Sequence, residues 1–432
     1  FKQKTAYEIG VRLVGSEMCI RDSNYIEEDE KIVFESQETL SEGVYELYLE
    51  FNSEITNDLK GFYKSSYMSE DGEKKWIATT QFEPTAARSA FPCWDEPEYK
   101  AIFSMTIITD EKYLRVSNEM VVEEEKVENN KLRTKFADSM KMSSYLVAFV
   151  IGDLEATVVG KSKTTDIRII HRPGFSHQTS YAGTAAIKLL DFFEDYYKIP
   201  YPGTKLDLIA IPDFAMGAME NVGAVTFREN LLLFDKDKAT RSELDRSITV
   251  IAHELAHMWF GDLVTMKWWD GIWLNEAFAS LMEVIASYNT YPEFKQWNAM
   301  NMSRTAGFSI DSLENSRPVE FDVETPDQAE EMFDVLTYEK GSTVLRMFQM
   351  FIGEEAFQNG VEAYLNKFKF ENTNSSDLWD ALSEASNQPL NKILPFWIRE
   401  KGYPFLQVDL SLIHISEPTR RTPISYAVFC LK

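Results

Sequence analysis

The stretch ITVIAHELAHMWF, residues 248–260, decides how the rest of the sequence is interpreted. It is rich in apolar residues, and on a helix His253 and His257 occupy positions i and i+4 of one face. Both imidazoles can then reach one zinc ion at about 2.0–2.1 Å. Glu254 lies beside the first histidine, where it could take a proton from a water molecule on that ion. The stretch therefore predicts a helix with a metal site; the alternative is two ordinary helix histidines with a chance glutamate between them.

A catalytic zinc ion takes three protein ligands and leaves one position for water, so a third ligand is needed. WLNEAFAS, residues 273–280, is typical of the start of a second helix, and its Glu276 has apolar neighbours. A carboxylate buried among them is costly unless it meets a cation, which a zinc ion supplies. We therefore predict that Glu276 is the third ligand. The alternative is a solvated glutamate.

The composition indicates a folded protein of several domains. A chain of 432 residues is too long for one ordinary core, so two or three domains are expected. Hydrophobic residues make up 44%, but no run approaches the roughly 18 apolar residues of a membrane-spanning helix. The net charge of -25, without any basic cluster, argues against nucleic-acid binding. We expect a soluble protein with an acidic surface and neither a membrane segment nor a nucleic-acid partner.

The two ends differ in composition from the rest of the chain. Residues 1–23 and 411–432 are net basic in an acidic chain, and they contain Cys19 and Cys430. We expect both stretches to be tails foreign to the native protein; the alternative is a natural disordered terminus. Between them only Cys93 remains, which leaves no pair for an internal disulfide and suits a reducing compartment. We therefore expect a cytoplasmic location.

The spacing of apolar residues divides the remaining chain into two parts. Residues 24–171 alternate apolar and polar side chains in short runs, as in VYELYLEF at 44–51. Such runs, separated by turn clusters such as EDGE at 70–73, are typical of antiparallel strands. Beyond residue 171 apolar residues recur mainly at helical spacing. The sequence thus predicts a β-rich N-terminal domain over 24–171 and a mainly helical domain over 172–405.

A second motif narrows the interpretation. GAMEN, residues 217–221, stands upstream of the two histidines and Glu276. Together these motifs resemble the gluzincin aminopeptidase family of alanyl and puromycin-sensitive aminopeptidases. The resemblance extends from about residue 26 to 410, and further stretches carry it: GFYKS (61–65), TQFEPTAAR (80–88), FPCWDEP (91–97) and TYEKG (337–341).

The resemblance implies an antiparallel β-rich N-terminal domain followed by a thermolysin-like catalytic domain of α+β type, mainly helical. This agrees with the boundary predicted near residue 172. Members of the family begin earlier and continue into a small β-sandwich and a helical domain. Here FLQVDL, residues 405–410, resembles only the first strand of that continuation, so residues 406–410 are expected to begin a region that is otherwise missing. We expect the chain to be a fragment.

Carried over position by position, the resemblance implies that His253, His257 and Glu276 hold one Zn2+ per chain. Glu254 would be the general base. Zinc lowers the pKa of its water towards 7 and polarises the scissile carbonyl, so Glu254 can accept a proton as hydroxide attacks and pass it to the leaving amine. Tyr338 would donate a hydrogen bond to the oxyanion of the tetrahedral intermediate. From the sequence alone, Tyr338 would instead be a core tyrosine.

The same resemblance implies how a peptide with a free N-terminus binds. Glu220 would bind the α-ammonium group, while the backbone at Gly217 and Ala218 pairs with the peptide like an added strand. Gln81 and Glu83 match positions that help to hold the amine and shape the first side-chain pocket. Without the resemblance, the two glutamates would equally well be solvated loop residues. The implied substrate-binding residues are Gln81, Glu83, Gly217, Ala218, Met219, Glu220 and Asn221.

Three alternatives to an aminopeptidase stay open. A thermolysin-like zinc endopeptidase shares both histidines and the glutamate ligand but lacks the N-terminus clamp, so Glu220 distinguishes the two. A leukotriene-hydrolase-like epoxide hydrolase is disfavoured because Ala218 stands where that branch carries a second glycine. A catalytically silent scaffold of the same fold usually loses metal ligands, whereas this sequence keeps all of them. The sequence leaves the oligomeric state open.

Overall fold

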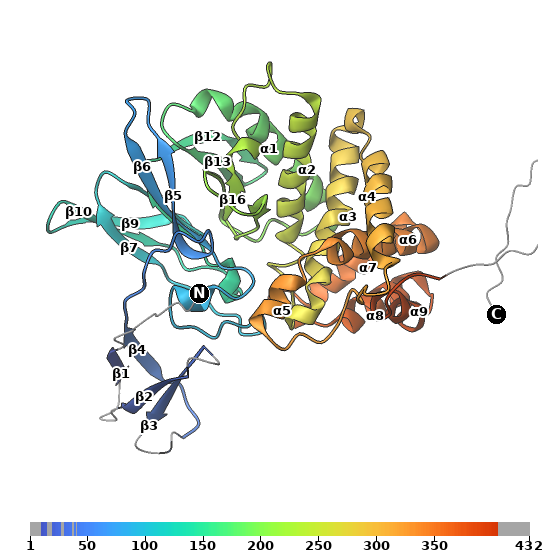
Figure 1. Ribbon diagram of the computed structural model, residues 1–432, viewed down its shortest axis with the longest axis horizontal. Coiled ribbons are helices and arrows are strands. Elements are labelled where there is room, and N and C mark those ends of the chain that lie inside the picture. The colour runs from blue at the N-terminus through green and yellow to red at the C-terminus, as the bar shows by residue number, and fades with distance from the viewer. Residues whose placement is uncertain (1–9, 15–19, 27–29, 37–38, 40, 405–432) are drawn as a thin grey trace, which may run out of the picture.

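The computed structural model describes residues 10–14, 20–26, 30–36, 39 and 41–404 of the chain. Its N-terminal part is built of strands and its C-terminal part mainly of helices, which confirms the predicted fold class (Figure 1). The strands of the first part are β1 (Gly10–Val14), β2 (Ile20–Ile26), β3 (Lys31–Ser36), β4 (Glu46–Glu50), β5 (Gly61–Met68), β6 (Lys74–Gln81), β7 (Thr106–Asp110), β8 (Leu114–Ser117), β9 (Val121–Val127), β10 (Lys131–Phe136), β11 (Phe149–Gly152), β12 (Glu155–Ser162) and β13 (Thr165–His171).

Two small antiparallel pairs involve the first strands: β1 with β4, and β2 with β3. β1 and part of β2 fall inside residues 1–23, the first of the two stretches expected to be foreign. Within that stretch, residues 1–9 and 15–19 lie outside the described residues. So do residues 406–410 and 411–432, and the predictions made for all these stretches stay predictions.

The larger N-terminal sheets are antiparallel. One has the order β5-β6-β11-β8 and the other the order β7-β10-β9. Most residues of β5 alternate between buried and half-buried, because successive side chains of a strand point to opposite faces. Gly61 of β5 lies opposite Gln81, the last residue of β6. Because β6 ends at Gln81, Glu83 lies in the loop that directly follows this strand.

A five-stranded mixed sheet links the two parts of the chain. Its order is β12-β13-β14-β16-β15, with the parallel pairs β13·β14 and β14·β16 and with β15 antiparallel at one end. The boundary predicted near residue 172 falls between β13 and the next helix, so it lies within this sheet rather than between two sheets. The boundary itself stays a prediction. The later strands are β14 (Lys205–Ile211), β15 (Ala218–Met219), β16 (Ala224–Arg228), β17 (Thr265–Met266) and β18 (Asn372–Thr373).

Helices dominate from residue 180 onwards, as their apolar spacing predicts. Thr240 caps the N-terminus of α2, since its hydroxyl accepts from the backbone of Glu243 while the Glu243 carboxylate accepts from the backbone of Thr240. The helices are α1 (Ser180–Tyr197), α2 (Arg241–His257), α3 (Trp273–Thr290), α4 (Gln296–Asp311), α5 (Pro326–Glu331), α6 (Gly341–Ile352), α7 (Glu354–Lys367), α8 (Ser375–Ser386) and α9 (Leu390–Ile398), and a π-helical turn spans Leu336–Lys340.

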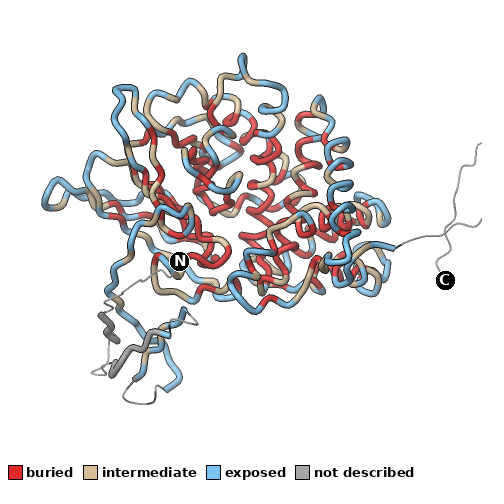
Figure 2. The backbone as a smooth tube through the Cα atoms, viewed as in Figure 1, coloured by how far each residue is buried: buried red, intermediate tan, exposed pale blue. Residues whose placement is uncertain are grey.

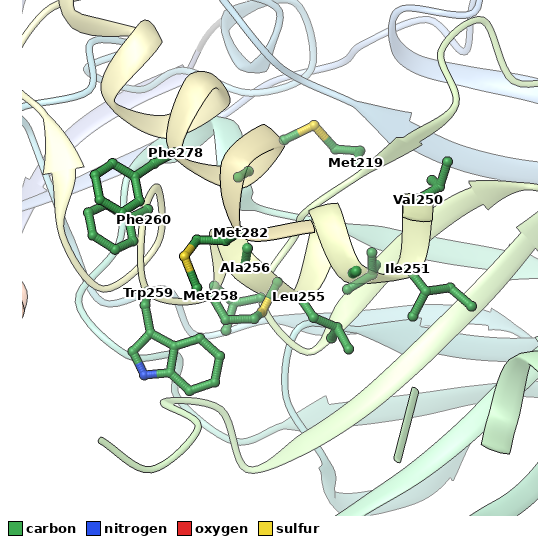
Figure 3. Packing of buried hydrophobic residues seen from close by; sticks show 14 of the residues in the cluster. Met219, Val250, Ile251, Leu255, Ala256, Met258, Trp259, Phe260, Phe278 and Met282 are labelled. Carbon is green, nitrogen blue, oxygen red and sulfur yellow. The ribbon is translucent and has the colours of Figure 1, made fainter. Parts of the chain in front are cut away.

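The core lies where the five-stranded sheet meets the first helices. Buried positions gather on β14, β16, α2 and α3, whereas β3 and β4 are largely exposed (Figure 2). At the end of α2, the ring of Phe260 stacks on that of Phe278 from α3 with centroids 3.7 Å apart (Figure 3). This packing fixes α2 and α3, the two helices that carry the predicted metal ligands, relative to each other. Within the described part of the chain, no helix combines the length and apolar character needed to cross a membrane.

Candidate functional site

A cavity of about 400 Å³ lies between the N-terminal sheet region and helices α2 and α3. It brings together most of the residues that the sequence singled out, from segments far apart in the chain. Gly217 and Asn221 are the exceptions, because neither lines it. The lining residues are Asp58, Leu59, Lys60, Gln81, Glu83, Pro84, Ala215, Met216, Ala218, Met219, Glu220, His253, Glu254, His257, Glu276, Glu330, Phe333 and Tyr338.

The three predicted metal ligands converge on one point. Oε2 of Glu276 lies 3.1 Å from Nε2 of His253 and 3.3 Å from Nε2 of His257. In a tetrahedral site with bonds of about 2.0–2.1 Å, neighbouring ligand atoms stand about 3.3–3.4 Å apart. Two imidazole nitrogens and a carboxylate oxygen are also a donor set that catalytic zinc accepts. The geometry and the chemistry of these side chains therefore fit a zinc ion.

Contacts on the far side of each imidazole orient it. Nδ1 of His253 lies 2.8 Å from Oε2 of Glu283, and Nδ1 of His257 lies 3.0 Å from the backbone oxygen of Phe260. Both partners accept hydrogen bonds, so each Nδ1 carries a proton and each Nε2 faces the shared point, where a metal ion that displaces the proton there can take its lone pair. Sequence reasoning missed Glu283. A signal existed, because Glu276 and Glu283 lie two turns apart on one face of α3.

The charges around the three side chains favour a cation. Burial opposes the charged form of His253, but its hydrogen bonds to Glu276 and Glu283 outweigh this and raise its pKa well above the usual range. Burial also opposes the charged form of His257, but Glu220 and Glu276 raise its pKa to about 10. Burial alone would raise the pKa of Glu276, yet the neighbouring imidazoles lower it below the ordinary value. The site thus attracts positive charge, either as protons or as a metal ion.

Glu254 lines the same cavity from α2 and is 5% exposed. Burial raises the pKa of its carboxyl group to about 8, against the lowering effect of His253 and His257. A carboxylate with a pKa near the working pH can both accept and release a proton. Its position and its pKa therefore suit acid–base chemistry.

A second group of carboxylates adjoins the first. Oxygens of Glu83, Glu220 and Glu276 lie within 4.8 Å of one another. Oε1 of Glu83 and Oε1 of Glu220 are buried and find no hydrogen-bond partner among the described residues. Burial raises the pKa of both glutamates and nearby carboxylates add to this, against the lowering effect of His257. Buried acceptors without partners favour a cationic, hydrogen-bond-donating ligand such as an ammonium group.

Gln81 and the GAMEN segment form the wall beside these carboxylates. Nε2 of Gln81 donates to Sδ of Met219 over 3.3 Å. β15, which comprises Ala218 and Met219, pairs only with β16 among the described strands, so its other edge can accept an extended peptide. The carbonyl of Gly217 accepts from the backbone of Arg228 at 2.9 Å.

The last GAMEN residue does not line the cavity. Asn221 is 1% exposed, and its Nδ2 donates to Oγ1 of Thr226 over 3.3 Å. It ties the turn between β15 and β16 together. Through these bonds Gly217 and Asn221 hold the backbone on either side of β15, and the substrate-binding role predicted for them stays a prediction. The motif itself did not reveal which of its side chains face the cavity.

Tyr338 reaches the cavity from the π-helical turn. Its ring stacks on that of His253, with centroids 5.9 Å apart and planes 20° from parallel. Burial raises the pKa of its hydroxyl well above the ordinary value, and Glu276 and Glu83 raise it further. The hydroxyl therefore keeps its proton and can donate a hydrogen bond.

An ion pair stands at the cavity beside these groups. Lys60, in the loop before β5, pairs with Glu330 of α5. Among the described residues that line the cavity, Lys60 is the only lysine or arginine. Sequence reasoning named neither residue, although Lys60 directly precedes the GFYKS stretch on which the resemblance rests.

Known proteins match this chain over both of its parts. Residues 181–397 match the peptidase family M1 domain, and residues 10–146 match the peptidase M1 N-terminal domain, which begins inside the stretch 1–23. Aminopeptidase M1 of Arabidopsis thaliana is 43% identical over 384 residues, 89% of this chain and 44% of that protein. Puromycin-sensitive aminopeptidase of Caenorhabditis elegans is 42% identical over 366 residues, 84% of this chain and 39% of that protein. Glutamyl aminopeptidase of Bos taurus is 40% identical over 400 residues, 91% of this chain and 42% of that protein.

The chain thus spans less than half the length of these relatives. The match nevertheless includes both the strand-rich part and the helices that line the cavity. The resemblance first indicated by the two histidines, Glu276 and the GAMEN segment is therefore confirmed over most of the described structure. By sequence, domain content and fold, this chain belongs to peptidase family M1.

Proposed function

We propose that this chain carries the centre of a zinc-dependent aminopeptidase, which removes single residues from the N-termini of peptides. One observation carries the proposal: a ligand set that fits zinc shares Glu276 with a buried group of carboxylates that fits an ammonium ion. The first group suits hydrolysis of a peptide bond. The second suits a charge that every free N-terminus has and that an internal peptide bond lacks.

His253, His257 and Glu276 would hold the zinc ion. When bound, zinc supplies Lewis acidity, which activates water and polarises the scissile carbonyl. Glu283 and the carbonyl of Phe260 keep the two imidazoles in the tautomer that binds a metal. These contacts also restrict rotation of both rings, so the site is arranged before a metal enters.

Glu254 would transfer the proton between the attacking water and the leaving amine. Its buried carboxylate accepts a proton from the attacking water and delivers it to the nitrogen of the leaving amine. Its raised pKa matches both halves of this task, because a stronger acid would not hold the proton long enough to return it.

Tyr338 would stabilise the oxyanion that forms on the carbonyl carbon. Its hydroxyl keeps its proton and stands at the cavity wall against His253. Loss of one such donor costs about 2.7–4 kcal/mol of transition-state stabilisation in other enzymes. We expect a cost of that order for Tyr338→Phe.

Glu220 and Glu83 would bind the substrate's α-ammonium group, with Gln81 beside them. The free edge of β15 would align the peptide backbone, so that the first peptide bond reaches the three metal-binding side chains. This arrangement would place the peptide bond after the first residue at the metal-binding side chains, so that one residue is removed at a time. The named relatives are aminopeptidases, and no observation favours an endopeptidase.

The test compares two peptides of one sequence, with a free and with an acetylated N-terminus. The zinc-loaded chain is expected to cleave only the free peptide, and Glu220→Ala is expected to abolish most of that cleavage. Glu119→Gln serves as the control, because Glu119 is also a buried glutamate but does not line the cavity. Equal cleavage of both peptides would contradict the proposal, and so would full activity after exhaustive removal of metal by a chelator.

A further inference from the structure

The turn that carries Tyr338 has an unusual shape. Leu336–Lys340 forms a single π-helical turn that leads directly into α6. Turns of this kind are rare, and each of their backbone hydrogen bonds spans one residue more than in an α-helix. The extra residue changes the direction in which the side chains point, so contacts outside the turn must hold it in this shape.

One such contact is a buried ion pair at the end of the turn. Nζ of Lys340 lies 2.9 Å from Oδ2 of Asp311, the last residue of α4, and the two side chains are 8% and 2% exposed. Nζ also donates to the carbonyls of Glu400 and Gly402, at 3.3 and 3.0 Å. The three protons of the lysine are thus all used. Separation of the two side chains would leave a buried charge without its partner, which is costly, so the pair opposes movements that part the turn from α4.

A second contact holds the start of the turn. Oδ1 of Asp334 accepts from the backbone of Leu336 at 2.9 Å and of Thr337 at 3.1 Å. Nη2 of Arg317 donates to the same carboxylate oxygen at 2.6 Å and to Oγ1 of Thr337 at 3.0 Å. Arg317 thereby fixes both the capping carboxylate and the turn that it caps.

The turn also packs tightly against the helix that carries Glu276. A Cβ atom on Gly341 would lie only 2.6 Å from Cβ of Ala277, the residue after Glu276. The backbone at Gly341 therefore approaches α3 as closely as a glycine allows. A shift of the turn would change the position of Tyr338 relative to Glu276 directly.

We infer that Lys340 and Arg317 are positioning residues, which hold the π-helical turn so that the hydroxyl of Tyr338 meets the oxyanion. This inference rests on the proposed function. Neither side chain lines the cavity, so each would act only through Tyr338. The two ion pairs act at opposite ends of one turn, and loss of either would let the turn relax towards an ordinary α-helix.

The experiment measures kcat and KM for alanine p-nitroanilide with zinc-loaded wild-type chain, Lys340→Met, Tyr338→Phe and the double variant. Lys340→Met keeps the length of the side chain and removes its charge. We expect kcat to fall about tenfold or more, towards the ~10²–10³-fold loss typical of a missing oxyanion donor, while KM changes little. In the Tyr338→Phe background, Lys340→Met is expected to cause almost no further loss, because the group that it positions is already gone.

Two further variants separate positioning from general damage. Lys205→Met breaks another buried lysine–aspartate pair, in which Nζ lies 2.8 Å from Oδ2 of Asp207, away from the cavity. It should lower stability but leave kcat near the wild-type value. Thr337→Val removes only the Arg317 bond to the turn and should fold even if Lys340→Met does not. It should lower kcat in wild-type chain but not in Tyr338→Phe.

The outcomes are distinct. If the wild-type chain cleaves the substrate but Lys340→Met and Thr337→Val lower kcat as much in Tyr338→Phe as in wild type, the positioning role is wrong and the proposed function stands. An effect on KM alone would also contradict it. If the zinc-loaded wild-type chain does not cleave any substrate with a free N-terminus, the proposed function fails and this inference fails with it.

Discussion

Nδ1 of His253 on α2 donates a hydrogen bond to Oε2 of Glu283 on α3, over 2.8 Å. The contact joins the two helices that hold the candidate zinc ligands. It also adds negative charge behind the imidazole, which makes Nε2 a stronger electron donor.

Glu283→Gln keeps a hydrogen-bond acceptor but removes that charge, and we expect it to weaken zinc binding about 10–100-fold. Competition with a chromophoric chelator measures the affinity. Glu243→Gln, at the opposite end of α2, is the control and should leave the affinity unchanged. If both variants bind zinc like the wild type, Glu283 has no part in the metal site.

Gly261 lies against the second imidazole, with a φ of +134°. A Cβ atom there would approach Nδ1 of His257 to 3.3 Å and Nδ2 of Asn275 to 3.4 Å. Gly261→Ala should therefore strain the backbone, at a cost of about 1–3 kcal/mol, and displace His257. Denaturant unfolding and zinc affinity measure the two effects.

Gly72→Ala is the matched control for Gly261→Ala. Gly72 also has a positive φ, +81°, but nothing lies within 4 Å of its would-be Cβ. Both variants should lose stability, but only Gly261→Ala should lose zinc affinity. An equal effect on zinc affinity in the two variants would show that close packing against His257 is unimportant.

We expect Lys60 and Glu330, which form an ion pair at the cavity, to tune its charge. Their side chains are 47% and 45% exposed, so the pair is screened by solvent and its effect is modest. Lys60→Met removes the only lysine among the described residues that line the cavity, and we expect kcat/KM for N-terminal arginine relative to leucine to rise about two- to fivefold. Glu330→Gln should shift this ratio the other way. A ratio that moves in the same direction in both variants would contradict this electrostatic account.

Lys100 makes stability depend on pH. Its Nζ donates to the carbonyls of Asp262 and Leu263, and burial lowers the pKa of the amine to about 7. In the unfolded chain the pKa is about 10.4. Between these values the unfolded chain binds more protons, so Lys100 makes stability rise with pH, by at most about 1.4 kcal/mol per unit.

Urea unfolding of the metal-free chain at pH 7.5 and 9.0 tests this sign. Lys100→Met should gain less stability than the wild type between these two pH values. Lys126→Met, at a lysine side chain that is 74% exposed, should behave like the wild type. If Lys100→Met shows the wild-type difference between the two pH values, the lowered pKa does not occur.

Much of the site follows from local spacing in the sequence. His253 and His257 meet because positions i and i+4 share one helix face, whatever the rest of the chain does. Alternating side chains likewise predict the strands of the N-terminal part, and helical periodicity predicts the helices of the C-terminal part. These are properties of a few consecutive residues, so a single sequence contains them.

Other features depended on how distant elements pack. The oxygens of Glu83, Glu220 and Glu276 come from three separate segments and lie within 4.8 Å only because the loop after β6, the GAMEN segment and α3 meet at one cavity. Within GAMEN, Asn221 bonds to Thr226 of β16 and does not line the cavity, which the motif could not show. The π-helical turn at Tyr338 breaks the period on which helix prediction relies.

The sequence by itself determined the candidate metal-binding side chains, the family resemblance and the change from a β-rich to a mainly helical part, because each is carried by short motifs or by local periodicity. Only the tertiary structure decided that Glu283 orients His253, that the five-stranded sheet continues across residue 172, and that Lys340 anchors the turn that carries Tyr338. The physical reason is that a hydrogen bond or a buried ion pair is defined by distance in space, and no local period records which distant residues the core brings together.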